Sequence, residues 1–313
     1  MSDRGKISLG IYGTGAKARV MYERWKDIDI VDILCFFDNK KEIEGCKILD
    51  KNVVHAARVN EWVGRLEYIV IVSLWENEIY QQLHEQYRRL QMKVLKNENE
   101  LEVLCKVSAI KKQYGWVGLN VGCGKTRFQG YLNCDLEEGD CCFDATETFP
   151  FTNDTFNYVY SEHFIEHLSF DDGVHFLRES QRVLQKGGRV RCLFPDLRSL
   201  LYFADKECYE QELLKERLVN GIIGKDGEIL QVPKCSKLQA RCWDGVDDVV
   251  NAFMRSWGHK YMWSATHLKE VFAIIGFNDI TVNSFGVSRD KQGCPDPVGR
   301  WGYQWTKAIE AKK

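Results

Sequence analysis

Two histidines and a glutamate are grouped in the segment His163-Phe164-Ile165-Glu166-His167. Histidine titrates near neutral pH, so one of them could be a general base that takes a proton from a hydroxyl. Positions i, i+3 and i+4 share one face of a helix, so His163, Glu166 and His167 could instead bind a divalent metal ion. Magnesium prefers oxygen ligands, which puts it in doubt here. A third interpretation is structural, with Glu166 and His167 bracing the segment against a sheet.

A further histidine, His259, follows Trp257-Gly258 and is a second candidate base. The pattern His-x-x-Glu-His also occurs in zinc proteases. The buried strands expected around it describe a different fold, so we reject the protease interpretation.

Glycine and acidic residues follow three short apolar segments that precede these histidines. Gly122-Cys123-Gly124 comes first, and its glycines let the backbone approach a ligand closely. Asp135 is placed to bind two ribose hydroxyls, and Asp144 with Ala145 to bind an adenine edge. Because the carboxyl ends of parallel strands meet at one edge of a sheet, these residues predict a nucleoside-binding site.

In this order the motifs closely resemble class I S-adenosylmethionine (SAM)-dependent methyltransferases. Ser161-Glu162-His163 matches the residues after the fourth strand, and 181–189 matches the turn before the fifth. The resemblance extends to about residue 285 and implies a seven-stranded sheet, SAM as cofactor and S-adenosylhomocysteine as product. It implies cofactor contacts from Asn120, Gly122, Cys123, Gly124, Asp135, Leu136, Asp144, Ala145, Ser161 and Glu162.

One departure from the family concerns the first crossover. Six residues, 125–130, separate the glycine loop from the second strand, whereas a parallel crossover with its helix needs about a dozen. We expect this helix to be missing or cut to a turn, as in a bacterial subgroup of the family. Lys125 and Arg127 either supply the lost positive charge near the cofactor or are solvated loop residues.

The N-terminal half repeats the strand-then-helix order. An apolar segment at 7–12 leads into Gly13-Thr14-Gly15, and Asp38 ends a second one at 30–37. This is a loose form of the dinucleotide fingerprint, and its glycines could equally serve a tight turn. The half is similar to small Rossmann-like domains that precede sugar-modifying transferases, some of which hold a nucleotide-sugar.

The spacing of apolar residues predicts the remaining helices and strands. Apolar spacing predicts helices over 78–96, 171–185, 213–223 and 245–257, an irregular segment over 231–243, and final strands over 280–285 and 301–309. We therefore predict an α/β protein with two Rossmann-like domains, residues 1–113 and 114–313. The second is expected to carry a class I methyltransferase sheet with a helical cap insertion.

Composition limits the classes of partner. A net charge of −2 argues against a nucleic-acid-binding protein, and no apolar run reaches the roughly 18 residues needed to span a membrane. The twelve cysteines contain no Cys-x-x-Cys pair, which fits neither a disulfide framework nor a zinc finger. With no signal peptide recognised, we expect a cytoplasmic protein.

The sequence thus predicts methyl transfer from SAM to a polar small molecule, with His163, His167 and His259 as candidate catalytic residues. The acceptor expected by analogy is a hydroxyl of a sugar, nucleotide-sugar or glycan. The alternative is a non-catalytic regulator or scaffold that binds SAM or a nucleotide-sugar. A nicotinamide-dependent reductase that uses the Gly13 loop is a third interpretation.

Overall fold

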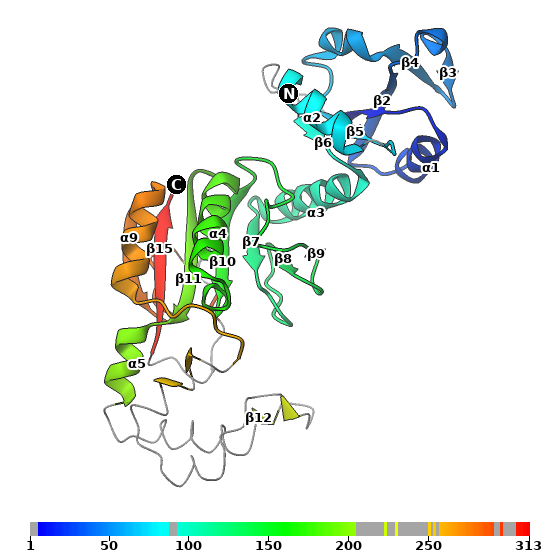
Figure 1. The fold of residues 1–313 in the computed structure, drawn as a ribbon. Helices are drawn as coiled ribbons and strands as arrows, with labels where there is room; N and C mark the ends of the chain where they lie inside the picture. The colour runs from blue at the N-terminus through cyan, green and yellow to red at the C-terminus, as the bar shows by residue number, and fades with distance from the viewer. Residues whose placement is uncertain are drawn as a thin grey trace. The chain divides into compact units, whose positions relative to one another are not determined.

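The computed structural model describes residues 6–74, 76–87, 93–204, 222–223, 229–230, 250–251, 253–254, 257–290, 295–296 and 305–313. The chain forms two compact units, 1–113 and 114–313 (Figure 1). Each unit has its own sheet with helices against it, which confirms the predicted α/β class.

The N-terminal unit is built on a six-stranded sheet in the order β3-β4-β2-β1-β5-β6. Its strands are β1 (Ile7–Tyr12), β2 (Val31–Asp38), β3 (Lys47–Ile48), β4 (Lys51–His55), β5 (Tyr68–Ile71) and β6 (Lys93–Leu95). All neighbouring pairs are parallel except β3 with β4. The helices are α1 (Ala16–Trp25), α2 (Glu76–Tyr87) and α3 (Glu98–Tyr114), with 3-10 turns η1 (Lys41–Ile43) and η2 (Ala56–Trp62).

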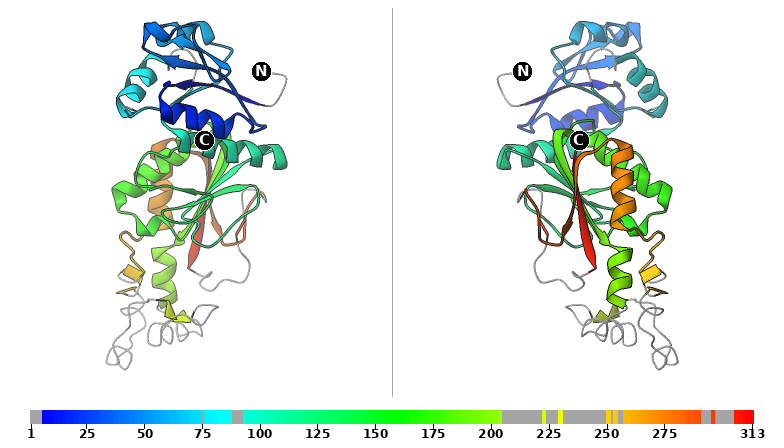
Figure 2. Two further views of the ribbon diagram at one scale, coloured as in Figure 1. Left: turned by 90° about the vertical axis from the view of Figure 1, so that its right-hand side faces the viewer. Right: turned by 90° about the vertical axis from the view of Figure 1, so that its left-hand side faces the viewer.

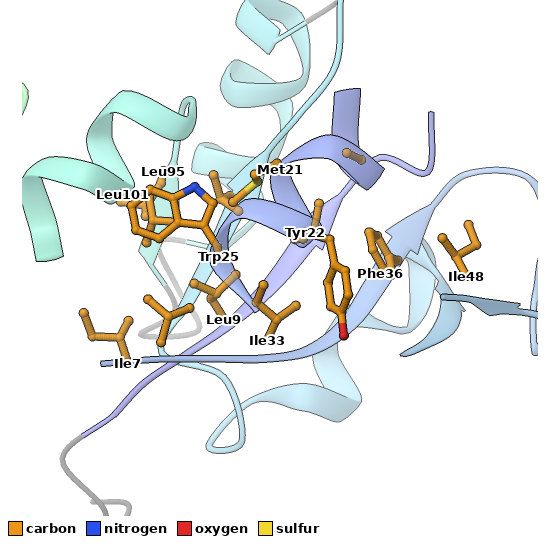
Figure 3. Close-up of a cluster of buried hydrophobic side chains, with 14 of the residues drawn as sticks. Ile7, Leu9, Met21, Tyr22, Trp25, Ile33, Phe36, Ile48, Leu95 and Leu101 are labelled. Carbon is orange, nitrogen blue, oxygen red and sulfur yellow. The ribbon is translucent and has the colours of Figure 1, made fainter. Parts of the chain in front are cut away.

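One buried cluster joins the first helix to this sheet (Figure 3). Met21 and Trp25 of α1 lie against side chains from both central strands and from α3. The labelled partners include Leu9, Ile33, Leu95 and Leu101.

The predicted helix over 78–96 is confirmed from residue 78 to Tyr87 and is wrong at residues 93–95. Residues 93–95 form strand β6, which pairs in parallel with β5. Val94 and Leu95 are buried there. These two apolar residues, which fit the spacing of a helix, instead pack as part of the edge strand of the sheet. A run this short does not distinguish helix from strand by periodicity.

The C-terminal unit has a seven-stranded sheet in the order β14-β15-β11-β10-β7-β8-β9. Its strands are β7 (Gly118–Val121), β8 (Tyr131–Asp135), β9 (Cys141–Cys142), β10 (Phe156–Glu162), β11 (Leu184–Pro195), β14 (Asn278–Ser284) and β15 (Thr306–Lys312). The five strands β11, β10, β7, β8 and β9 are parallel to one another, and β15 is antiparallel to both of its neighbours, β11 and β14. This is the sheet order of class I methyltransferases, as predicted.

Two capped helices pack side by side on one face of this sheet, α4 (Phe170–Val183) and α9 (Ala265–Ile275) (Figure 2). Ser169 Oγ accepts from Asp172 N, and Ser264 Oγ accepts from His267 N. Gly276 closes α9 in the left-handed conformation, which glycine adopts without strain. Helix α4 ends at Val183, two residues before the predicted end, because Leu184 already pairs with Phe156 of β10.

The predicted loss of the first crossover helix is confirmed, since 122–130 forms turns between the parallel strands β7 and β8. Farther along are α5 (Leu197–Ala204), η4 (Ile165–His167) and a strand pair, β12 (Ile222–Ile223) with β13 (Ile229–Leu230). Ile222 and Ile223 are therefore not helical. The rest of the predicted helix over 213–223, the segment 231–243, most of 245–257 and residues 301–304 of the predicted last strand lie outside the described residues.

No helix in the described part of the chain is both long and apolar enough to span a membrane.

Candidate functional site

The site lies where the order of the C-terminal sheet reverses. Strands β8 and β9 follow β7 on one side, and β10 and β11 lie on the other, so the loops after β7 and β10 face each other at the carboxyl edge. Open α/β sheets bind their ligands at this switch point. The loop after β7 begins at Gly122, and the loop after β10 begins at His163.

An aromatic contact joins these two loops. Gly122 has φ +68°, and a Cβ added to it would lie 2.4 Å from the ring of Phe164. Glycine is required here because Phe164 packs on the loop and because the backbone is left-handed. The contact brings the expected cofactor loop against the expected catalytic segment.

Asp135, at the end of β8, holds the glycine loop. Its Oδ2 accepts from Gly124 N and its Oδ1 accepts from Leu136 N, each at 2.7 Å. Gly124 also has a positive φ, but a Cβ added to it would meet no atom of the described structure within 4 Å. Gly124 therefore faces open space, which suits a loop that must admit a ligand. The Leu136 side chain is 61% exposed beside it.

Arg127 folds back onto the same loop. Its Nη1 donates to Gly124 O at 2.5 Å and to Cys123 Sγ at 3.1 Å. The guanidinium thus braces the turn that replaces the missing helix and places a positive charge beside it. Cys123 itself is buried.

Asp144 follows β9 in a tight turn. Its Oδ1 accepts from the backbone N and the Oγ1 of Thr146, at 2.8 and 2.7 Å. These bonds, with the positive charge of Lys260, hold the pKa of Asp144 below its usual value. Ala145 is buried, so in this dipeptide the acid is the side chain that faces solvent.

Three of the residues expected at the cofactor lie within the sheet itself. Asn120 is buried in β7, and its Nδ2 donates to Asn133 Oδ1 of β8 at 3.1 Å. Ser161 is fully buried in β10, while Glu162 ends that strand and accepts from Tyr160 Oη at 3.3 Å. The side chain of Asn120 therefore ties two strands together.

The histidine segment is not a regular helix. His163 has φ +48°, and η4 begins two residues later. The predicted shared helix face of His163, Glu166 and His167 is therefore not formed. Instead His163 Nδ1 is 3.1 Å from Glu166 Oε1, and Nε2 is 3.1 Å from Thr306 Oγ1, so both ring nitrogens have partners.

The structure brings Glu166 together with His167 and His259. One ligand atom from each lies within 4.8 Å of the other two. Lys260 N and Tyr261 N both donate to Glu166 O, at 2.8 and 3.2 Å, which fixes the His259 segment on η4. The two imidazoles meet edge to face at 4.9 Å between ring centroids.

Glu166 is fully buried yet favours its charged form. Burial raises its pKa, but the hydrogen bond and charge of His163, with the charge of His167, hold the pKa below its usual value. Burial lowers the pKa of His259, against the opposing charge of Glu166. The cluster therefore combines a buried carboxylate with an imidazole that favours its neutral form.

Sequence reasoning missed four residues of this site: Phe164, Phe253, Lys260 and Thr306. Phe253 O accepts from His259 Nδ1, and the other three make the contacts described above. Phe164 and Lys260 adjoin chosen histidines, but nothing in the sequence links Phe253 or Thr306 to them.

Residues 135–192 match the family model described as a methyltransferase domain. No curated protein matches the chain. Among solved structures, a SAM-dependent methyltransferase from Thermotoga maritima is 16% identical, with 77% of this chain and 100% of that chain covered and a TM-score of 0.37. One from Archaeoglobus fulgidus is 15% identical, with 75% and 99% covered and a TM-score of 0.38.

The matched segment and the strand order together define the C-terminal unit as a class I methyltransferase domain. The protein is a SAM-dependent methyltransferase. Its residues fit the cofactor, because the open side of Gly124 lies beside a strand-end carboxylate, that of Asp135.

Proposed function

We propose that this enzyme transfers the methyl group of SAM to a hydroxyl of a sugar, nucleotide-sugar or glycan. In this proposal Asp135 binds the cofactor ribose, Asp144 and Ala145 bind the adenine, and the acceptor hydroxyl is held and deprotonated at Glu166, His167 and His259. The observation that supports this proposal is the contact of Phe164 with Gly122, because Phe164 precedes Glu166 by two residues in the chain.

The chemistry asks little of the protein beyond alignment. The acceptor oxygen forms a bond to the methyl carbon as the carbon–sulfur bond breaks, and the electron pair stays on sulfur to give S-adenosylhomocysteine. The hydroxyl proton leaves to the cluster. Holding the two reactants in line supplies most of the acceleration, and removal of the proton adds about 10²–10⁴-fold.

His163 is a positioning residue in this scheme. With Nδ1 on Glu166 and Nε2 on Thr306, it holds the buried carboxylate in place. Support for a sugar acceptor comes from Trp257, whose ring lies 5.6 Å from that of His259 between centroids. Aromatic faces beside a polar group suit the apolar face of a sugar ring.

The first test measures S-adenosylhomocysteine release with panels of sugars, sugar nucleotides and amines. We expect turnover with a sugar hydroxyl. His167→Ala and His259→Ala should each lower kcat by about 10²–10⁴-fold while the Kd for SAM changes less than about twofold.

Asp135→Ala should instead weaken SAM binding, and His55→Ala in the N-terminal unit serves as the control. Turnover with amines alone would contradict the hydroxyl acceptor. SAM binding without methylation of any panel member would favour the non-catalytic alternative.

A further inference from the structure

Glu166, His167 and His259 have the composition and spacing of a metal-binding site. Their ligand atoms lie within 4.8 Å of one another, so each is at most about 2.8 Å (4.8 Å divided by the square root of three) from a common point. Zinc–ligand distances are about 2.0–2.2 Å for imidazole nitrogen and carboxylate oxygen. An inward shift of less than about 1 Å by each side chain therefore completes the coordination.

Hydrogen bonds to two of these three side chains orient them to bind a metal ion. His259 Nδ1 donates to Phe253 O, which leaves the lone pair on Nε2. Metal-binding histidines characteristically make this bond with the nitrogen that does not bind the metal. The Glu166 carboxylate is likewise hydrogen-bonded on one oxygen, Oε1, by His163.

The other oxygen of Glu166 is an independent sign of a ligand. Oε2 is buried and has no hydrogen-bond partner among the described residues. A buried carboxylate oxygen left unpaired carries its full desolvation penalty, which is larger for a charged group than for a neutral one. A purely structural role for Glu166, as the partner of His163, uses Oε1 alone and leaves this cost unexplained.

We propose that Glu166, His167 and His259 bind a divalent ion of the zinc class and leave a coordination position open to the acceptor. Two nitrogens and one oxygen suit zinc, whereas magnesium requires mostly oxygen. Three protein ligands with an open fourth position is the arrangement of catalytic zinc sites. The inference rests on the proposed function and deepens it, because a hydroxyl bound to the ion would be made more acidic and would lose its proton to solvent. The three side chains would then act as ligands in place of a general base.

This ligand set differs from the one considered from sequence. His163 is outside it, because both of its nitrogens already have partners. His259 enters it from a distant segment that the backbone bonds to Glu166 O hold in place. A histidine-rich set predicts that zinc, and not magnesium, is bound.

The test titrates the chelator-treated full chain with Zn²⁺ and separately with Mg²⁺ by calorimetry. We expect one zinc per chain and at least about 100-fold weaker magnesium binding. Glu166→Gln, His167→Ala and His259→Ala should each weaken zinc binding by at least about 100-fold, more than the loss of an outer partner does. His55→Asn should leave it unchanged.

Cysteines are the competing source of zinc binding. Cys46 and Cys142 are exposed, so the titration is repeated with both changed to serine. Substitution with Co²⁺ gives a second measurement, in which thiolate ligands produce an intense near-ultraviolet band that nitrogen and oxygen ligands lack. The proposal predicts visible absorption bands of bound Co²⁺ without the near-ultraviolet thiolate band. It also predicts that the visible bands are lost in His259→Ala.

Unchanged zinc affinity in all three variants, or no zinc binding by the unmodified chain, would overturn the proposal. Circular dichroism identifies a variant that fails to fold, and Glu166→Gln keeps the shape of the buried side chain. SAM binding and methylation are measured on the same samples. Zinc binding without methylation would reject the proposed function alone, and methylation without zinc binding would reject the metal site alone.

Discussion

At the scale of single residues, Gly122 joins the proposed cofactor loop to the segment proposed to be catalytic, through its contact with Phe164. Its left-handed backbone and its contact with Phe164 both disfavour a side chain. We expect Gly122→Ala to lower the free energy of unfolding by about 1–3 kcal/mol and to weaken SAM binding. Denaturant unfolding and calorimetry measure the two effects.

Gly124→Ala is the matched comparison, because it has a positive φ but no neighbour within 4 Å of the added Cβ. It should cost less stability and still weaken SAM binding, since the Cβ projects into open space beside Asp135. Phe164→Ala combined with Gly122→Ala should recover part of the lost stability. If it recovers none, the ring contact is not what requires glycine at position 122.

Sequence patterns identify residues best where one side chain and its local strand define the role. Asp135 and Asp144 each end an apolar segment, and the structure places both at the carboxyl edge of the sheet. The partners of His163 and His259 could not be found this way. Thr306 is 143 positions from His163, and a contact that distant leaves no periodic signal.

At the scale of elements, strands of the second unit could be predicted from apolar segments that end at a glycine or an acidic residue. The apolar segment before Gly122 is strand β7 (Gly118–Val121), and the one that leads to Asp135 is strand β8 (Tyr131–Asp135). Strand β6 was missed because Val94-Leu95 is too short a signal, and only pairing with β5 decides its structure. Local propensity is overridden by tertiary contacts at such places.

Helix α4 is anchored to the turn before β10 by Glu179 and Arg182. Glu179 Oε2 accepts from Phe149 N at 2.8 Å, while Arg182 donates to Phe149 O and Phe151 O at 3.0 and 2.7 Å. The two side chains also pair with each other at 2.6 Å. Arg182→Ala leaves these acceptors unpaired, so we expect a loss of about 1–3 kcal/mol in denaturant unfolding at pH 7.

The same anchor predicts a pH dependence. Burial raises the pKa of Glu179, but the hydrogen bonds from Arg182 and Phe149 N, with the charge of Arg182, hold that pKa below its usual value. A carboxyl with a lowered folded pKa stabilises the protein above the unfolded value, and this contribution disappears as pH falls through the folded pKa. The stability difference between the unmodified chain and Glu179→Gln should therefore shrink as the pH falls below about 4.5, which denaturant unfolding at a series of pH values measures.

At the scale of the whole molecule, buried ion pairs hold the last strands of the second unit on its central sheet. Buried Arg191 of β11 pairs with Glu310 of β15 at 2.5 Å and with Asp296, and it donates to Val287 O at 3.1 Å. Asp296 Oδ2 also accepts from Gly286 N. The last strands are thus tied to the central sheet by charges that would be costly to leave unpaired.

We therefore expect residues 114–313 to fold and bind SAM without the first 113. Every described contact of the proposed cofactor site, from Gly122 with Phe164 to Asp144 with Thr146, lies within this unit, and so do its sheet and the Arg191 network. Calorimetry should give a Kd for SAM within about threefold of the full chain, a difference of less than about 0.7 kcal/mol. Arg191→Met serves as a destabilised comparison. A folded fragment that binds SAM more than about tenfold more weakly would show that the first unit contributes to the cofactor site.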